Sequence, residues 1–271
     1  DDVRHVSWQV KLSVQLALAA YIATIFWGSF DTITFYNYSF PVTQIFLLAI
    51  FLFWFIGIYN AVNLLDGLDG LAGGFMILVC IGAALAGNEA FAQLNFVFAT
   101  LLLGFLVFNQ RISKLFMGDA GSLFLGFHIA VMPLLFAESM PFSTIVHTTP
   151  FVLLATYLVA DTTRVFFTRL AVKKSPMTAD TIHFHHVILQ QSGSYLASIG
   201  SIYFVTLITV LFAAFSFSNL LSVNFMMGHL ALLLIFILTP PIQTYVPLFT
   251  RLLNPFYSWQ IHQETKSPFL P

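Results

Sequence analysis

Polar side chains interrupt a long apolar stretch at residues 60–74, NAVNLLDGLDGLAGG. Two amides and two carboxylates recur there at every third residue, so a helix would bring them close to one face. They are Asn60, Asn63, Asp66 and Asp69. Such groups at the end of an apolar segment are costly unless they bind a ligand. Proteins hold Mg²⁺ or Mn²⁺ through carboxylate oxygens and substrate phosphates, so the stretch indicates a site for a divalent cation and a phosphate compound.

Two further motifs offer matching chemistry, MGDAGS at 117–122 and HFHH at 183–186. Asp119 supplies another carboxylate, and its flanking glycines allow a phosphate or metal to approach the backbone closely. We expect Ser122 to cap the helix that follows. The three histidines could bind zinc, but their tight spacing and the lack of a nearby cysteine favour an anionic substrate.

Asp161 has two alternative roles. It lies three residues before Arg164, so the two side chains would form an ion pair on one helical face. A role in the site itself is the other alternative, and the sequence leaves both open. Most of the remaining basic residues need no role beyond anchoring the protein at one membrane surface.

The elements that must position these groups are membrane helices. The chain of 271 residues is 59% hydrophobic and 8% charged, whereas a soluble domain is typically about 25% charged. Runs of about 20 apolar residues predict eight spans. They lie near 12–30, 42–60, 71–87, 93–109, 122–137, 145–165, 197–217 and 228–247. We therefore predict an all-α integral membrane protein, a polytopic bundle of about eight transmembrane helices that forms a single domain over residues 1–271.

The basic residues assign a side to each connection. All ten Lys and Arg residues fall on, or at the edge of, the side that holds 1–11, 61–70, 110–121, 166–196 and 248–271. The opposite connections contain only acidic charges. The positive-inside rule makes the first side cytoplasmic, and both acidic motifs and the histidines lie on it. No phosphate-binding GxxxxGK[ST] loop, nucleophile elbow or basic nucleic-acid stripe is present in the sequence.

The order of these motifs resembles the polyprenyl-phosphate N-acetylhexosamine-1-phosphate transferases, a glycosyltransferase family 4 group that includes the peptidoglycan translocase. Five segments carry the resemblance. They are Asp1 and Asp2 with Lys11, residues 60–74, Asn109 with FMGDAGSLFLGF at 116–127, ADTTRVFFTRL at 160–170, and SPMTADTIHFHH at 175–186. The HxHH form resembles the branch that uses N-acetylglucosamine.

The resemblance implies a helical membrane enzyme in the bacterial inner (plasma) membrane, with its active site on the cytoplasmic face. It implies transfer of a sugar 1-phosphate from a UDP-N-acetylhexosamine, most simply UDP-GlcNAc, to polyprenyl phosphate, with release of UMP. The implied cofactor is Mg²⁺, with Mn²⁺ as an alternative. The expected partners are the two substrates and the lipid bilayer, with no nucleic acid; a homodimer is left open.

The resemblance also assigns roles to residues. Asp1 and Asp2 match an acidic pair proposed to activate the lipid phosphate. Asp119 matches the principal Mg²⁺ ligand, with Asp66 close by.

The nucleotide-pocket positions are Asp69, Asn109 and Phe116, where Phe116 would stack on uracil, and Asn63 is placed with them. His183, His185 and His186 match the motif associated with recognition of the sugar phosphate.

Three departures from the family pattern bear on these roles. Thr181 stands where the family usually has Arg, which removes one cationic phosphate contact. Leu158 stands where a proline is common. Members carry more helices before the acidic pair, so we expect this chain to be N-terminally incomplete.

Several alternatives stay open. The acceptor phosphate, largely dianionic at neutral pH, favours direct attack, but a covalent intermediate through an aspartate is the alternative mechanism. Another UDP-N-acetyl sugar is an alternative donor. A silent membrane protein that binds lipid phosphate or nucleotide is an alternative function, and a transporter fits less well because the acids cluster on one face.

Overall fold

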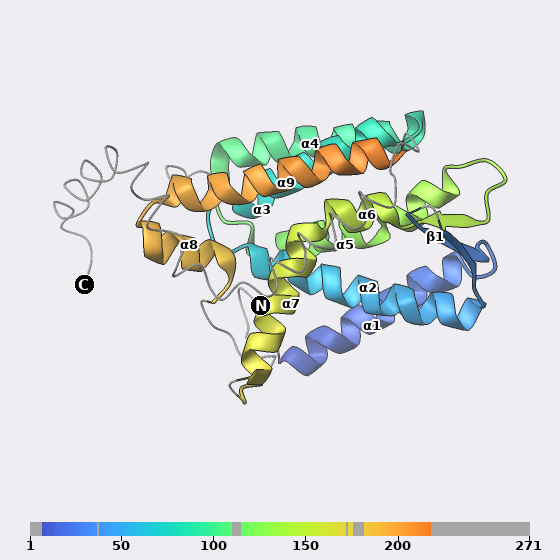
Figure 1. Ribbon diagram of the computed structural model, residues 1–271, viewed down its shortest axis with the longest axis horizontal. Helices are drawn as coiled ribbons and strands as arrows, with labels where there is room; N and C mark the ends of the chain where they lie inside the picture. Colours follow the sequence, from blue (N-terminus) through green and yellow to red (C-terminus); the bar gives the residue numbers. More distant parts are fainter. Residues whose placement is uncertain (1–6, 37, 110–114, 172, 176–181, 218–271) are drawn as a thin grey trace.

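The computed structural model describes residues 7–36, 38–109, 115–171, 173–175 and 182–217, which form a bundle of helices with a small sheet at one end (Figure 1). The helices are α1 (Trp8–Ile25), α2 (Gln44–Leu65), α3 (Leu71–Ala86), α4 (Glu89–Asn109), α5 (Gly118–Glu138), α6 (Thr149–Leu154), α7 (Thr156–Ala171), α8 (Phe184–Ser192) and α9 (Tyr195–Phe217). The strands are β1 (Thr32–Phe35), β2 (Tyr38–Pro41) and β3 (Ile145–His147). The predicted helical membrane architecture is confirmed.

Within the described residues, four helices are long and apolar enough to cross a membrane. They are α2, α4, α5 and the Tyr195–Ala214 part of α9. The expected count of eight is therefore not confirmed. The run at 228–247 lies outside the described residues, and α3 is apolar but only 16 residues long.

The run at 145–165 is not one continuous span. It folds as β3, then α6, then α7, with the break at Ala155. The Thr156 hydroxyl donates to the carbonyl of Leu153 at 2.8 Å and to that of Val152 at 3.1 Å, which satisfies carbonyls freed at the end of α6. Leu158 lies in the first turn of α7, where a proline would also be tolerated, so its departure from the family pattern does not alter this break.

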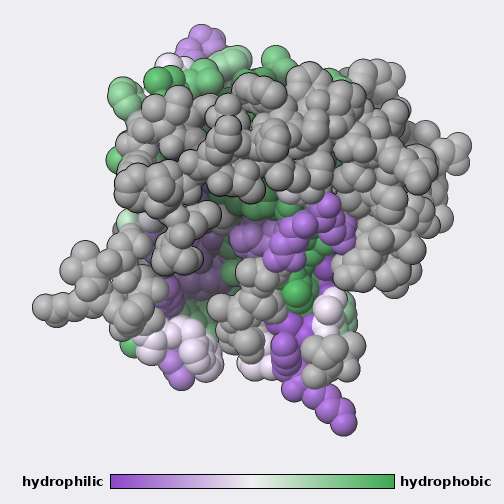
Figure 2. All heavy atoms as spheres, turned by 90° about the vertical axis from the view of Figure 1, so that its left-hand side faces the viewer, coloured by the Kyte–Doolittle hydropathy of each residue, from purple (hydrophilic) through white to green (hydrophobic). Residues whose placement is uncertain are grey.

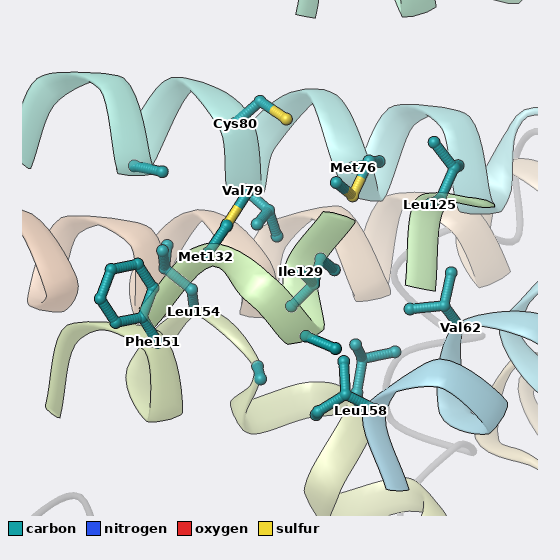
Figure 3. Close-up of a cluster of buried hydrophobic side chains, with 14 of the residues drawn as sticks. Val62, Met76, Val79, Cys80, Leu125, Ile129, Met132, Phe151, Leu154 and Leu158 are labelled. Carbon is teal, nitrogen blue, oxygen red and sulfur yellow. The ribbon is translucent and has the colours of Figure 1, made fainter. Parts of the chain in front are cut away.

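Close packing around α5 holds the bundle together. α5 packs on α2 and α6, while α3 packs on α4 and α9. Figure 3 shows the apolar cluster at their junction, which runs from Phe151 and Leu154 at one side through Met132 and Ile129 to Val62 at the other. Because lipid is as apolar as these side chains, interhelical contact rather than transfer from water stabilises such a core.

The sheet lies at the opposite end of the bundle from α8 (Figure 1). β1 is the middle strand, antiparallel to β2 and parallel to β3. It joins the connection between α1 and α2 to the connection between α5 and α6. The sequence predicted a connection at 31–41, where β1 and β2 lie, and placed β3 inside the expected span at 145–165, because strands of three or four residues carry little periodic signal.

Candidate functional site

A cavity of about 290 Å³ lies where α2 and α4 end and α5 begins. It brings together six residues that the sequence nominated. They are Asn63, Asp66, Asp69, Asn109, Phe116 and Asp119; Gly67, Leu68, Met117 and Gly118 complete the lining. Figure 2 shows hydrophilic side chains gathered on the end of the molecule that carries α8.

The repeated amides and carboxylates do not share one helical face, and that part of the prediction was wrong. α2 ends at Leu65, so Asp66 and Asp69 lie in a loop that we call the aspartate loop, residues 66–70. Gly70 has a φ of +78°, in the left-handed region that favours glycine, and this turn redirects the chain into α3. The loop still places both carboxylates at the cavity with Asn63.

Unlike Asn63, Asp66 and Asp69, Asn60 does not line the cavity. Its amide exchanges two hydrogen bonds with Gln15 of α1, at 2.8 and 3.0 Å. The amide of Asn60 also donates to the carbonyl of Ile56. Asn60 therefore joins α2 to α1 one turn away from Asn63.

Asn109 holds the cavity wall. Its side-chain oxygen accepts a hydrogen bond from the Gly70 amide at 2.7 Å, and its side-chain nitrogen donates to the carbonyl of Leu115 at 2.7 Å. One amide thus connects the aspartate loop to the segment before Asp119. The nucleotide contact expected for Asn109 stays a prediction, as does that of Phe116, whose ring is 71% exposed beside the cavity.

Two tyrosines of α9 support the aspartate loop from the other side, and sequence reasoning missed them. The Tyr203 hydroxyl donates to the carbonyl of Gly70 at 2.6 Å, and the Tyr195 hydroxyl donates to the carbonyl of Asp69. A side chain at Gly74 would collide with the Tyr203 ring, so the glycine lets α9 approach α3 closely. The available signal was the pair of tyrosines on one apolar helix, two turns apart.

Asp119 is surrounded by polar partners. The Lys11 ammonium contacts one carboxylate oxygen at 2.7 Å, and the Asn63 amide donates to the other at 3.2 Å. The same Asn63 nitrogen lies 2.9 Å from the Ser122 hydroxyl. The prediction that Ser122 caps α5 was wrong, because the helix begins four residues earlier, at Gly118. The Ser122 hydroxyl instead donates to the carbonyl of Gly118 within the helix.

The cavity suits a hydrated divalent cation. Asp66, Asp69 and Asp119 line it, and Mg²⁺ commonly binds through one or two carboxylates, with waters and phosphates supplying the other ligands. The Lys11 ammonium beside Asp119 favours the charged form of this carboxyl group, which keeps it able to bind a cation. Among the described residues, no group of three or more His, Cys, Asp or Glu side chains is arranged to enclose a metal, so waters and substrate phosphates would have to supply most ligands of a cation held by these carboxylates.

The histidine cluster lies behind the aspartate loop. A Cβ atom at Gly67 would be 2.5 Å from the Nε2 atom of His185 and 3.1 Å from that of His186, so a side chain there would push against both rings. None of the three rings is among the cavity-lining side chains. Burial lowers the pKa of His185 to about 3, with a smaller contribution from His186, so its ring is neutral.

Asp161 pairs with Arg164, as one of its two predicted roles required, with 2.8 Å between carboxylate and guanidinium. It also contacts His183. Arg164 is buried, so the alternative of a simple surface anchor does not describe it. Asp1, Asp2 and Thr181 lie outside the described residues.

Comparison with known proteins gives consistent relatives. Residues 1–137 match the family described as Glycosyl transferase family 4. A probable undecaprenyl-phosphate N-acetylglucosaminyl 1-phosphate transferase of Bacillus subtilis (strain 168) is 32% identical over 212 residues, which is 76% of this chain and 58% of the relative. An undecaprenyl-phosphate alpha-N-acetylglucosaminyl 1-phosphate transferase of Thermotoga maritima is 29% identical over 196 residues, 72% of this chain and 58% of the relative.

A phospho-N-acetylmuramoyl-pentapeptide-transferase of Staphylococcus carnosus is 42% identical over a shorter stretch of 107 residues, 38% of this chain and 33% of the relative. The chain thus spans less than two thirds of the length of these three relatives. The resemblance inferred from the motifs is confirmed. The chain belongs to glycosyl transferase family 4.

Proposed function

We propose that this protein transfers N-acetylglucosamine 1-phosphate from UDP-GlcNAc to undecaprenyl phosphate and releases UMP. The observation that carries the proposal is the single cavity that gathers Asp66, Asp69 and Asp119 beside Asn63 and the exposed ring of Phe116. The names of two relatives, from Bacillus subtilis and Thermotoga maritima, support the choice of acceptor and sugar.

In this mechanism Asp119 and Asp66 would hold Mg²⁺, with Mn²⁺ as an alternative metal. When bound, the metal neutralises charge on the donor pyrophosphate and improves UMP as a leaving group. An oxygen of the lipid phosphate forms a bond to the β-phosphorus of the donor, the bond from that phosphorus to the bridging oxygen breaks, and UMP leaves with the electron pair. Asp1 and Asp2 are proposed to position the acceptor phosphate or to remove a residual proton.

The remaining residues bind the donor. Asp69, Asn109, Asn63 and Phe116 are assigned to the nucleotide, with Phe116 stacking on uracil because aromatic rings stack favourably on bases. The histidine cluster is assigned to the sugar phosphate and supports the aspartate loop from behind. From the placement of the basic residues, we propose a bacterial plasma membrane location with the cavity on the cytoplasmic face.

The test supplies membranes that contain the protein with Mg²⁺, undecaprenyl phosphate and radiolabelled UDP-GlcNAc. Lipid-linked label is the expected product. Label with a different UDP-N-acetylhexosamine would reassign the sugar, and no lipid-linked label with any such donor would reject the enzyme assignment.

A matched pair of variants tests the metal ligand. Asp119→Asn should abolish Mg²⁺-dependent transfer because it removes a charged ligand while keeping the shape of the side chain. Glu89→Gln makes the same chemical change at the start of α4, on an exposed residue that does not line the cavity, and should keep full activity. Normal transfer by Asp119→Asn would remove Asp119 from the metal site.

A further inference from the structure

A buried polar network joins α7 to the start of α8, apart from the residues that line the cavity. One Asp161 oxygen accepts from the Arg164 guanidinium at 2.8 Å and from the Phe184 backbone amide at 3.2 Å. Its other oxygen lies 2.8 Å from the Nδ1 atom of His183. The residues Asp161, Arg164 and His183 are each 5% exposed or less, so the network is enclosed by protein.

Both carboxylate oxygens of Asp161 have hydrogen-bond partners. Burying a carboxylate is costly unless ion pairs and hydrogen bonds replace its hydration, and both oxygens of Asp161 have partners. The Arg164 guanidinium also donates to the carbonyl of Ile182 at 2.6 Å and stacks over the Phe184 ring, 4.3 Å from its centre. These contacts fix the residue before the histidines as well as the residue between them.

The network determines which nitrogen of His183 carries the proton. Because a carboxylate only accepts, Nδ1 must donate to Asp161, and in the neutral ring Nε2 is then an acceptor. Within the described part of the chain, the Nε2 atom of His183 is buried without a hydrogen-bond partner. A buried acceptor in this condition is costly unless a ligand supplies a donor.

Stacked rings connect this histidine to the aspartate loop. The His183 and His185 rings are nearly parallel, with centres 5.9 Å apart, and the His185 and His186 centres are 4.2 Å apart. The Nε2 atom of His185 in turn faces Gly67. A movement of His183 would therefore be transmitted through packed rings to the loop between Asp66 and Asp69.

We infer that Asp161 is a positioning residue for the transfer reaction, acting through His183, whose ring orientation and protonated nitrogen it sets. This inference rests on the proposed function for its activity readout. Asp161 would then orient the His183 ring in addition to forming the ion pair with Arg164. The alternative is that Asp161 only staples α7 to α8, and the two differ in how they depend on His183.

The decisive variant is Asp161→Asn. The asparagine oxygen can keep the contacts to Arg164 and the Phe184 amide, while its nitrogen donates to Nδ1 and moves the histidine proton to Nε2. Losses of about 10- to 100-fold are typical when a group that orients a functional histidine is changed, so we expect transfer to fall by that factor. Thr162→Val, the next residue on α7, is the matched control and should keep full activity.

A double-variant cycle with His183→Gln separates positioning from stapling. If Asp161 acts through His183, adding Asp161→Asn to His183→Gln should lower transfer by less than about twofold further, since effects on one functional unit are not additive. A full additional loss would overturn the inference, as would unchanged transfer by Asp161→Asn alone.

A measurement on the unaltered protein covers the case in which the variants fail to fold. Nitrogen-15 NMR of the histidine rings should show the His183 proton on Nδ1. A neutral ring protonated only on Nε2 would overturn the inference. Because this readout does not use activity, absence of transfer by the unaltered protein would reject the proposed function and leave the assignment of the histidine proton to be decided by the spectrum.

Discussion

Gly126 of α5 controls how closely that helix approaches α2, and Gly126→Ala should disturb the site from a distance. A Cβ atom at this position would lie 2.7 Å from the carbonyl oxygen of Tyr59 and 2.9 Å from its Cα atom. These are backbone atoms of α2, so they cannot rotate away as a side chain would. The two helices must separate.

The separation can be worked out from the contact. Ordinary van der Waals contact begins near 3.4 Å, so a gap of 2.7 Å must widen by about 0.7 Å. One turn along the same seam, Asn63 lies 3.2 Å from the Asp119 carboxylate and 2.9 Å from the Ser122 hydroxyl. The same shift gives distances of about 3.9 and 3.6 Å, which are too long for hydrogen bonds.

Overpacking of this kind typically costs about 1–3 kcal/mol of stability. A misplacement approaching 1 Å at reacting groups can cost about 100-fold in rate. For Gly126→Ala we therefore expect a lower melting temperature and a drop in transfer of about 10- to 100-fold.

The assay measures lipid-linked product and thermal unfolding on the same preparation. Gly57→Ala is the matched control, because a Cβ atom at that exposed α2 position meets nothing within 4 Å. Full transfer and an unchanged melting temperature in Gly126→Ala would refute the reasoning. A lower melting temperature with full transfer would show that the seam between α2 and α5 is not coupled to the site.

Three further predictions follow from the same geometry. Lys11→Gln removes the ammonium group that competes with a metal ion for the Asp119 carboxylate. A partly exposed ion pair is worth up to about 1 kcal/mol, so the variant should bind Mn²⁺ up to about fivefold tighter. Electron paramagnetic resonance of Mn²⁺ measures this, and Lys173→Gln, at an exposed lysine, is the control. Weaker Mn²⁺ binding would contradict this. Tyr203→Phe removes one of two donors to the Gly70 carbonyl, which keeps its bond from the Gly74 amide, and should lower the stability in thermal unfolding by about 0.5–1.5 kcal/mol. Tyr21→Phe, on the exposed side of α1, should not lower it, and equal melting of both variants would count against the loop support. Burial lowers the pKa of His185 from 6.5 to about 3 in the folded protein. As the pH falls from 6.5 toward 3, the unfolded chain takes up a proton on this ring while the folded protein does not, so the free energy of unfolding decreases over that range and is unaffected by His185 above it. The acid-induced drop in melting temperature should therefore be smaller in His185→Gln, and an identical pH profile would rule His185 out as its source.

The gathering of the site could be predicted from the sequence because the polar residues are so few. In a chain with 8% charged residues, Asp66, Asp69 and Asp119 stand out against apolar runs, and the basic residues placed them on one side of the membrane. The cavity confirms that this acidic group meets with Asn63 and Asn109.

The internal geometry could not be predicted in the same way. A three-residue spacing of Asn60 through Asp69 indicated one helical face, but Gly67 and Gly70 end that regularity and turn the chain into a loop. The tyrosines of α9 that bind this loop are more than 120 residues away along the chain, and their spacing on one helical face does not say which segment they contact. The break at Ala155 was hidden for a similar reason, because apolar residues continue through it without a change in composition.

Register between the helices explains why so many polar contacts surround the cavity. Apolar helix surfaces in lipid can slide past one another with little loss, because lipid replaces the lost contacts with equally apolar ones. A reciprocal amide pair cannot slide, and Gln15 with Asn60 is such a pair between α1 and α2. A shift of one residue moves a helix by about 1.5 Å and would break both of its hydrogen bonds.

The amide pair lies one helical turn from a residue that contacts Asp119 on each of the two helices. Lys11 precedes Gln15 by four residues on α1, and Asn63 follows Asn60 by three residues on α2, and both contact Asp119. The amide pair therefore sets the axial position at which a cation from α1 and an amide from α2 reach the same carboxylate of α5. Pairing two amides adds little stability, because each hydrogen bond only replaces one to water or to another group. Fixing the register of the helices therefore accounts for the pair better than its strength does.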